Sequence, residues 1–251
     1  LADAEQAVRL VFLTVAAWWL VFTLPLLVFV KERKPDRRQA LLSAVKEGWA
    51  QLRATFRRVR ELRPVLLFLV AYWLYIDGVN TVMKVAIDFG YKLGIGQRDL
   101  LVALLIVQFV SFPAALLFGW LGGKIGPKHG LLIGLSVYIV VTIWAAFMHA
   151  PWEFYVLACA VGMVQGGVFS LSRSYYARLI PADESAEFFG FYNMIGKFAA
   201  VLGPLLVAAA AALSGSTRAA IPAILPLLVG GGLLLLAGPK AHHHDDQSLS
   251  Q

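Results

Sequence analysis

Cysteine is almost absent from this sequence, since Cys159 is the one cysteine in 251 residues. A lone cysteine cannot form a disulfide within the chain, and we expect it to pack as a small apolar residue. The sequence also lacks a glycine-rich loop that ends in lysine and serine or threonine, so ATP-driven pumping by this chain is unsupported. No group of aspartates stands at a metal-binding spacing, and we therefore expect no catalytic site, no metal and no cofactor.

Charge is scarce as well, at 15% of residues, whereas hydrophobic residues make up 59% and the mean hydropathy is +0.72. A soluble domain of this length does not carry so much apolar surface. Residues 10–30 contain no charge at all, and 21 residues at about 1.5 Å each span the hydrocarbon core of roughly 30 Å. The sequence therefore predicts an integral membrane protein.

Seven apolar segments are long enough to cross the bilayer. They are residues 10–30, 65–84, 100–120, 131–149, 152–173, 188–213 and 221–238. The first has no basic segment before it and is too long for a signal peptide, so we expect a true span. Because the sequence starts with leucine and the number of spans is odd, we also expect that it is part of a longer protein.

The basic residues predict the orientation. Half of the 22 lysines and arginines lie in residues 31–63, and others follow on alternate connections, at Lys124, Lys128, Arg173, Arg178 and Lys240. The positive-inside rule then puts the 31–63 connection and the C-terminus in the cytoplasm. The net charge of +7 and the pI of about 9.6 follow from this topology, and we expect no nucleic-acid binding.

The 31–63 connection has a helical pattern of its own. Its apolar residues recur at spacings of three and four, at Leu41, Leu42, Val45, Trp49, Leu52, Phe56, Val59 and Leu62. Asp36 and Gln39 have the spacing of a capping box. We expect an amphipathic helix at the cytoplasmic surface, with its basic face toward anionic headgroups. A target helix for a calmodulin-like protein is the alternative.

Polar residues interrupt the second span. If this span begins at Val65, Asp77 lies about 18 Å into the membrane, whereas Lys84 and Asp88 lie at or beyond the far boundary. A charge at the centre costs about 2.5–3.5 kcal/mol, so Asp77 needs a partner or water. The polar residues share one helical stripe, which consists of Asp77, Asn80, Thr81 and Lys84 together with Trp73.

The sixth span offers a partner for Asp77. Lys197 lies about 14 Å from Phe188, at a similar depth, and Asn193 lies one turn before it on the same face. We therefore predict a candidate contact between Asp77 and Lys197. The sequence leaves three roles open for Asp77: binding a substrate amine, exchanging a proton, or holding Lys197 in a structural ion pair.

The remaining spans differ in polarity. The third contains Gln108 and Pro113, which predicts a kink, and the fifth contains Gln165. In the fifth span Gly162 and Gly166 form a GxxxG pair, which predicts the close approach of another helix. The first, fourth and seventh spans have no charge in their cores, so we expect every third helix to face lipid. This period is typical of secondary transporters built from inverted repeats.

Three stretches carry a resemblance to a known family: "FLVAYWLYIDGVNTVMKVAIDFGYKLGI", "VQFVSFPAALLFGWLGGKIGPKHGLL" and "VGMVQGGVFSLSRSYYARLIPADESAEFFGFYNMIGKFAAVLGPLL". They resemble the carboxy-terminal half of a major facilitator superfamily transporter, and most of all the vacuole-effluxer-like group, whose fungal members export amino acids. The resemblance implies an all-α membrane protein that contains the six-helix carboxy-terminal half and one preceding helix. It divides the chain into 1–30, the first span; 31–63, a cytoplasmic linker; 64–238, the transporter half; and 239–251, a cytoplasmic tail.

The same resemblance implies secondary transport of a small solute by alternating access, with amino-acid efflux as the specific expectation. The partners would be the solute, protons as a candidate coupling ion, the lipid bilayer and a missing amino-terminal half, in a bacterial inner membrane. A seven-helix sensor and a non-transporting scaffold are the alternatives. A retinal protein is disfavoured because residues 221–238 contain no lysine.

The site residues that follow are in three groups. The expected solute or coupling pathway comprises Asp77, Asn80, Gln108, Gln165, Tyr192, Asn193 and Lys197. The expected gating loop comprises Gly119, Leu121, Gly126 and Lys128, and the cytoplasmic end of the pathway comprises Arg173 and Arg178. Gly123 occupies the position at which the superfamily loop has an acidic residue, so the charge network that latches one conformation is in doubt.

Overall fold

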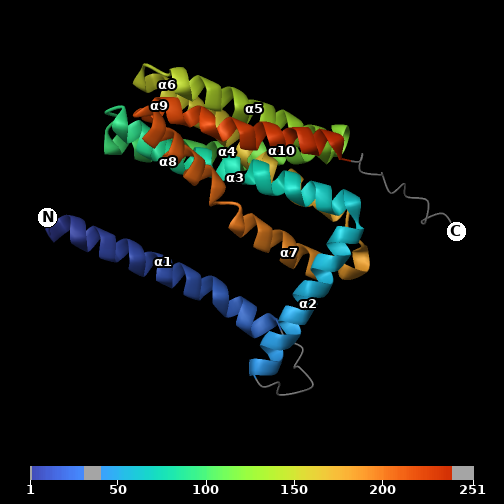
Figure 1. Ribbon diagram of the computed structural model, residues 1–251. Helices are drawn as coiled ribbons and strands as arrows, with labels where there is room; N and C mark the ends of the chain where they lie inside the picture. Colours follow the sequence, from blue (N-terminus) through green and yellow to red (C-terminus); the bar gives the residue numbers. More distant parts are fainter. Residues whose placement is uncertain (1, 31–40, 239–251) are drawn as a thin grey trace. The chain divides into compact units, whose positions relative to one another are not determined.

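The computed structural model of the chain describes residues 2–30 and 41–238, and all regular secondary structure in these ranges is helical (Figure 1). The helices are α1 Ala2–Phe29, α2 Leu41–Glu61, α3 Arg63–Lys92, α4 Gln97–Ile125, α5 Pro127–Phe147, α6 Pro151–Ala177, α7 Ser185–Phe198, α8 Leu202–Ser214, α9 Thr217–Ala220 and α10 Leu225–Ala237, with short 3₁₀ helices η1 Ala182–Glu184 and η2 Ile221–Ile224. Seven helical segments within the described residues are long and apolar enough to cross a membrane. The predicted all-α membrane protein is confirmed. The chain forms two compact units, Leu1–Trp49 and Ala50–Gln251.

In the first unit, α1 carries no charged residue from Leu10 to Phe29, and the side chains of residues 6–29 are exposed. The hydroxyl of Thr14 donates to the carbonyl of Leu10, and the hydroxyl of Thr23 donates to that of Trp19, each at 2.7 Å. These bonds satisfy both hydroxyls within the helix, as a lipid environment requires. The helix therefore suits the hydrocarbon core of a bilayer.

In the second unit, α4 and α6 approach each other at the two predicted glycines. A Cβ atom on Gly162 would lie 3.0 Å from the carbonyl oxygen of Val107, and one on Gly166 would lie 2.8 Å from that of Ser111. Only glycine leaves room for the backbone of α4 at these positions. The predicted close approach is confirmed, and the partner of the GxxxG pair is the third span.

Helix α3 is the most buried of the spans. In its most apolar stretch 61% of residues are buried, against 39% for α5, α6 and the last span, 22% for α4, and 17% for the sixth span. Helix α10 packs closely against α3, because a Cβ atom on Gly231 would lie 2.8 Å from the backbone nitrogen of Tyr75. Burial within this chain therefore does not single out the fourth and seventh spans as the lipid-facing ones, and that expectation stays a prediction.

A cluster of aromatic side chains joins α3, α6 and α7. Its members are Phe68, Tyr72, Tyr75, Tyr175, Tyr176, Phe189 and Tyr192. The ring of Tyr192 stacks on that of Tyr72 with centroids 4.3 Å apart, and on that of Tyr176 at 5.0 Å. The hydroxyl of Tyr176 also donates to the carbonyl of Phe188 at 3.0 Å. Stacking and hydrogen bonding together fix α7 against the neighbouring spans.

The linker helix contacts the segment before the sixth span. Arg58 forms an ion pair with Glu184 at 3.0 Å, and the amide of Gln51 donates to Glu187 at 2.8 Å. The hydroxyl of Thr55 donates to the same carboxylate at 3.3 Å. The hydrogen bond between Arg58 and Glu184 raises the pKa of the Arg58 guanidinium. The predicted linker helix is confirmed from Leu41 onward, whereas the proposed capping residues 36 and 39 lie outside the described residues.

Candidate functional site

The sixth span is broken in its middle. Helix α7 ends with a bond from the amide of Ala199 to the carbonyl of Ile195 at 2.9 Å, and the ladder resumes with Leu205 donating to Val201 at 3.3 Å. Pro204 explains the break, because proline has no N–H to donate four residues back and its ring clashes with that carbonyl. The predicted span over residues 188–213 occurs in the structure, but residues 199–201 divide it into two helices.

Asp77 of α3 accepts a hydrogen bond from a backbone amide that the break leaves without its helical partner. In a continuous helix the amide of Gly203 would donate to the carbonyl of Ala199; here it donates to Oδ2 of Asp77 at 3.0 Å. The carboxylate lies in the first turn of α8, where the helix dipole favours a negative charge. Asp77 is only 1% exposed and acts as a cap that is supplied by another span.

Two more side chains of α3 donate hydrogen bonds to the backbone carbonyls that the break leaves without an N–H donor. The amide of Asn80 donates to the oxygen of Ala199 at 3.0 Å, and Nζ of Lys84 approaches the oxygen of Ala200 at 3.4 Å. An unsatisfied backbone group costs several kcal/mol in the hydrocarbon core, so these contacts make the break tolerable. The polar stripe of the second span thus replaces the hydrogen bonds that the sixth span has lost.

Thr81 completes this arrangement by steric fit. Its hydroxyl donates to the carbonyl of Asp77 at 2.7 Å, and it lies against the α-carbon of Gly203, where a Cβ atom would overlap Thr81 Oγ1. Thr81 is fully buried, so the two helices meet here without intervening space. We call Asp77, Asn80, Thr81 and Lys84, with residues 199–203, the break site.

The predicted contact between Asp77 and Lys197 is wrong. The structure gives Asp77 the amide of Gly203 as its partner, and no ion pair within 4.0 Å joins it to Lys197, which is exposed on α7. The depth argument assumed a continuous helix, but α7 ends one residue after Lys197, so the backbone turn faces Asp77 instead. The second oxygen of Asp77, Oδ1, is buried and has no hydrogen-bond partner among the described residues.

The other predicted pathway residues do not gather at the break site. Gln108 on α4 and Asn193 on α7 are exposed, whereas Tyr192 is 2% exposed and belongs to the aromatic cluster. Gln165 is half-buried on α6, and its Oε1 is buried without a hydrogen-bond partner in the part of the chain that the structure describes. Of the seven residues, the structure brings Asp77 and Asn80 together.

The predicted gating loop joins α4 to α5. Gly126 has a φ of 84°, a conformation that favours glycine and ends one helix while it begins the next. Lys128 is 9% exposed, and its ammonium donates to the carbonyl of Leu236 at 3.0 Å and to that of Gly238. The lysine therefore binds the C-terminal end of α10, where the helix dipole favours a positive charge.

The remaining predicted residues lie at the periphery. A Cβ atom on Gly119 or on Gly123 would meet nothing within 4 Å, so open space surrounds the position at which the superfamily has its acidic residue. Leu121 is half-buried. Arg173 and Arg178 are exposed at the end of α6. The roles predicted for these residues stay predictions.

Sequence reasoning missed Gly203 and the backbone of residues 199–203. The signal was present, because the dipeptide Gly203–Pro204 stands inside the apolar segment 188–213. Proline in a span frees a backbone carbonyl, and a polar stripe at similar depth on another span is a source of donors. The acidic residues Glu184 and Glu187 were also missed, since nothing local in the sequence links them to the linker helix.

The chain is similar to proteins that are named as transporters. The family model described as "Vacuole effluxer Atg22 like" matches residues 2–246. The chain is 39% identical over 219 residues to "Uncharacterized MFS-type transporter YxiO" of Bacillus subtilis, which covers 87% of this chain and 51% of that protein. It is 30% identical over 230 residues to "Autophagy-related protein 22" of Yarrowia lipolytica, over 80% of this chain and 39% of that protein. The chain thus spans about half, or less, of these relatives. It belongs to the vacuole effluxer Atg22-like family, in the major facilitator superfamily.

Proposed function

We propose that the chain is part of a secondary active transporter that moves a small solute by alternating access. The observation that carries this proposal is the position of Lys197. Lys197 stands 12 residues after Ser185, about 18 Å along α7, and 17 residues before Ser214 at the end of the span. It is exposed, and no hydrogen bond or ion pair holds it within the described residues.

A lysine in the middle of a span does not face lipid without a large cost. Insertion scales assign about 2.5–3.5 kcal/mol to such a charge at the centre of a helix. Exposed Asn193 lies one turn before Lys197 on the same face of α7, and exposed Gln108 stands in the middle of α4. These side chains suit the wall of a water-filled path. The sixth span and α4, which carry these side chains, also have the smallest shares of buried residues among the spans of the second unit, at 17% and 22%.

We assign amino acids as the solute class. Lys197 offers a cation for the carboxylate that every amino acid carries, and the amides of Asn193 and Gln108 offer both donors and acceptors. The direction we propose is efflux, in line with the effluxer description of the matching family. The buried carboxylate of Asp77 is our candidate for coupling to protons.

We propose that the movement between the two access states includes a change of helix orientation at the break site. Because α7 and α8 are separate helices, α8 can tilt relative to α7 about residues 199–201 while the aromatic cluster holds α7. Asp77 and Asn80 hold the turn at residues 199–203 in the state described here. We propose that these contacts change during the transport cycle.

The chain spans about half of its relatives, so the other wall of the path is proposed to come from an amino-terminal half. We further propose that the linker helix and the C-terminus lie in the cytoplasm, and that the protein resides in a bacterial inner membrane. On this view the isolated 251-residue chain inserts into a membrane without transporting. Uptake by proteoliposomes that contain only these residues would contradict this view.

The experiment that tests the function measures export from proteoliposomes containing the full-length protein. The vesicles are loaded with the twenty amino acids, a pH gradient is imposed, and mass spectrometry follows the loss of each amino acid. Lys197→Met is expected to lower the rate at least tenfold, whereas Lys197→Arg, which keeps the charge, retains most of it. Lys46→Met removes the same charge from α2 and serves as the control. Equal export by Lys197→Met and wild type would refute the proposal.

A further inference from the structure

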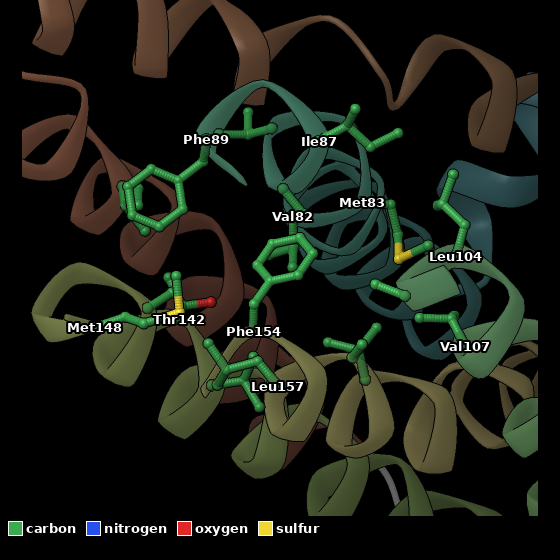
Figure 2. A pocket seen from close by; sticks show the side chains of 18 of the residues that line it. Val82, Met83, Ile87, Phe89, Leu104, Val107, Thr142, Met148, Phe154 and Leu157 are labelled. Carbon is green, nitrogen blue, oxygen red and sulfur yellow. The ribbon is translucent and has the colours of Figure 1, made fainter. Parts of the chain in front are cut away.

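A cavity lies inside the bundle, and none of its lining residues belongs to the break site. It is formed by the last third of α3, the first third of α4, the end of α5, the start of α6 and η2 (Figure 2). Its labelled lining residues are Val82, Met83, Ile87, Phe89, Leu104, Val107, Thr142, Met148, Phe154 and Leu157. The cavity has a volume of about 80 Å³. This volume is smaller than the roughly 300–1,000 Å³ of a pocket that holds a whole small molecule, so the cavity has room for only a short segment of a ligand.

The lining of the cavity excludes a polar solute. Thr142 is the one lining residue with a polar side chain, and its hydroxyl already donates to the carbonyl of Tyr138 at 2.7 Å. An amino acid or a sugar would lose its hydration here without gaining hydrogen bonds, at a cost of several kcal/mol. The cavity therefore suits a ligand, or part of a ligand, that is wholly hydrocarbon.

The depth of the cavity matches one leaflet of the bilayer. On α3 the lining runs from Phe89 to Val82, which is three to ten residues from the end of the helix at Lys92. On α6 it runs from Phe154 to Val161, three to ten residues from the start at Pro151. At 1.5 Å per residue these positions lie about 4–15 Å inside the helix ends, whereas half of the hydrocarbon core is roughly 15 Å.

The cavity is closed toward water and open toward the side. Near the helix ends, Gly90 of α3 packs against Leu100 and Phe154 so closely that a Cβ atom would lie 3.1 Å from the ring of Phe154. Deeper, Ile87 of α3 is 39% exposed and Leu104 of α4 is half-buried. Figure 2 shows Met83 between the two helices, beside Leu104. The way in therefore lies between α3 and α4, at the depth of the acyl chains.

We infer that this cavity binds a short segment of one acyl chain of a membrane phospholipid, which inserts sideways between α3 and α4. Acyl chains are the molecules that surround the bundle at this depth, and they match a lining that offers no polar group. The charges beside the helix ends, Asp88, Lys92, Arg98 and Asp99, cancel in sum. The cavity therefore recognises the acyl chain of the lipid and not an anionic headgroup.

Photolabelling of the full-length protein in nanodiscs tests this inference. The probe is a phosphatidylcholine with a diazirine in the middle of one acyl chain, and mass spectrometry identifies the labelled peptides after irradiation. We expect label on residues 82–89 and 154–161, in addition to the outward face of α4 at Val102 and Phe109, which are 39% and 77% exposed. Label on the outward face alone would overturn the inference.

Paired variants show whether the labelled chain is inside the cavity. Ala103 is 3% exposed and lines the cavity, so Ala103→Phe fills it and should lower labelling of residues 82–89 at least tenfold. Val102→Phe adds a ring to the outward face of the same helix and should leave this labelling unchanged. If Ala103→Phe does not fold, Ala86→Leu repeats the test from α3. Undiminished labelling in a folded filling variant would contradict the inference, as would labelling by a diazirine fatty acid but not by the phospholipid.

Discussion

Replacement of Asp77 by alanine and by asparagine separates the two properties of its carboxylate. Alanine removes both the acceptor and the charge, and leaves the amide of Gly203 buried without a partner. An orphaned buried donor costs about 1–3 kcal/mol, and loss of a capping side chain costs about 0.5–2 kcal/mol. These figures describe the same bond, so we expect Asp77→Ala to lower the free energy of unfolding by about 2 kcal/mol.

Asparagine keeps an oxygen of the same shape for the amide of Gly203, and asparagine caps helices about as well as aspartate. The charge contributes about 0.3–1 kcal/mol at a helix N-terminus, but its burial is itself unfavourable, so we expect Asp77→Asn to change stability by about 0.5 kcal/mol or less. The comparison therefore isolates the acceptor from the charge.

Thermal unfolding of detergent-solubilised protein measures this difference. A thiol-reactive dye reports exposure of Cys159, the single cysteine of these residues, which is half-buried on α6. A loss of about 2 kcal/mol corresponds to a lower Tm by roughly 4–8 °C in a chain of this size. Asp77→Ala should show this shift and Asp77→Asn should melt close to the wild type. Equal destabilisation by both variants would refute the capping role, and so would an unchanged Tm in Asp77→Ala.

Two further predictions concern contacts between elements that are distant in the sequence. Gly203→Ala should destabilise the protein by about 1–3 kcal/mol, because its Cβ would overlap Thr81 Oγ1, and Thr81→Ala in the same chain should restore part of the loss in the same melting assay. Arg58→Glu should speed tryptic cleavage of α2, since it sets two like charges against each other, and the added exchange Glu184→Arg should slow cleavage again. Fast cleavage of the doubly exchanged chain would show that the ion pair does not hold α2.

Much of the fold could be predicted from the sequence because a bilayer imposes simple rules. Each span must be long and apolar, and all seven predicted segments occur in the structure. The GxxxG pair was also predictable, since Gly162 and Gly166 lie one turn apart and leave one face of α6 free of side chains. Both signals are local, and they hold whichever helices become neighbours.

The candidate site was predictable in part. Helical spacing alone predicts the stripe of Asp77, Asn80 and Lys84. All three side chains contact the sixth span, and of these contacts only that of Asp77 was predicted. Lys197 was chosen as the partner because depth was counted along a continuous helix. The break moves the contact from a side chain to the backbone, and backbone acceptors and donors have no signature in a sequence except the Pro204 that frees them.

Contacts of the linker helix could not be predicted at all. Arg58 and Glu184 are 126 residues apart, and either residue alone fits a charged surface in contact with water or headgroups. The cavity between α3, α4, α5 and α6 is a similar case, because its lining residues are ordinary apolar residues of four different spans. The cavity exists only because these residues leave a volume unfilled when the four helices pack, and the sequence does not show that packing.

The most direct test of the transport account is the effect of Asp77→Asn on uphill transport by the full-length protein in proteoliposomes. The variant keeps the acceptor that holds the break in the sixth span, so the fold should persist while the negative charge is removed. Under an imposed pH gradient, loaded wild-type vesicles should export an amino acid against its gradient, and Asp77→Asn vesicles should only equilibrate it. Uphill export by Asp77→Asn equal to that of the wild type would contradict the account.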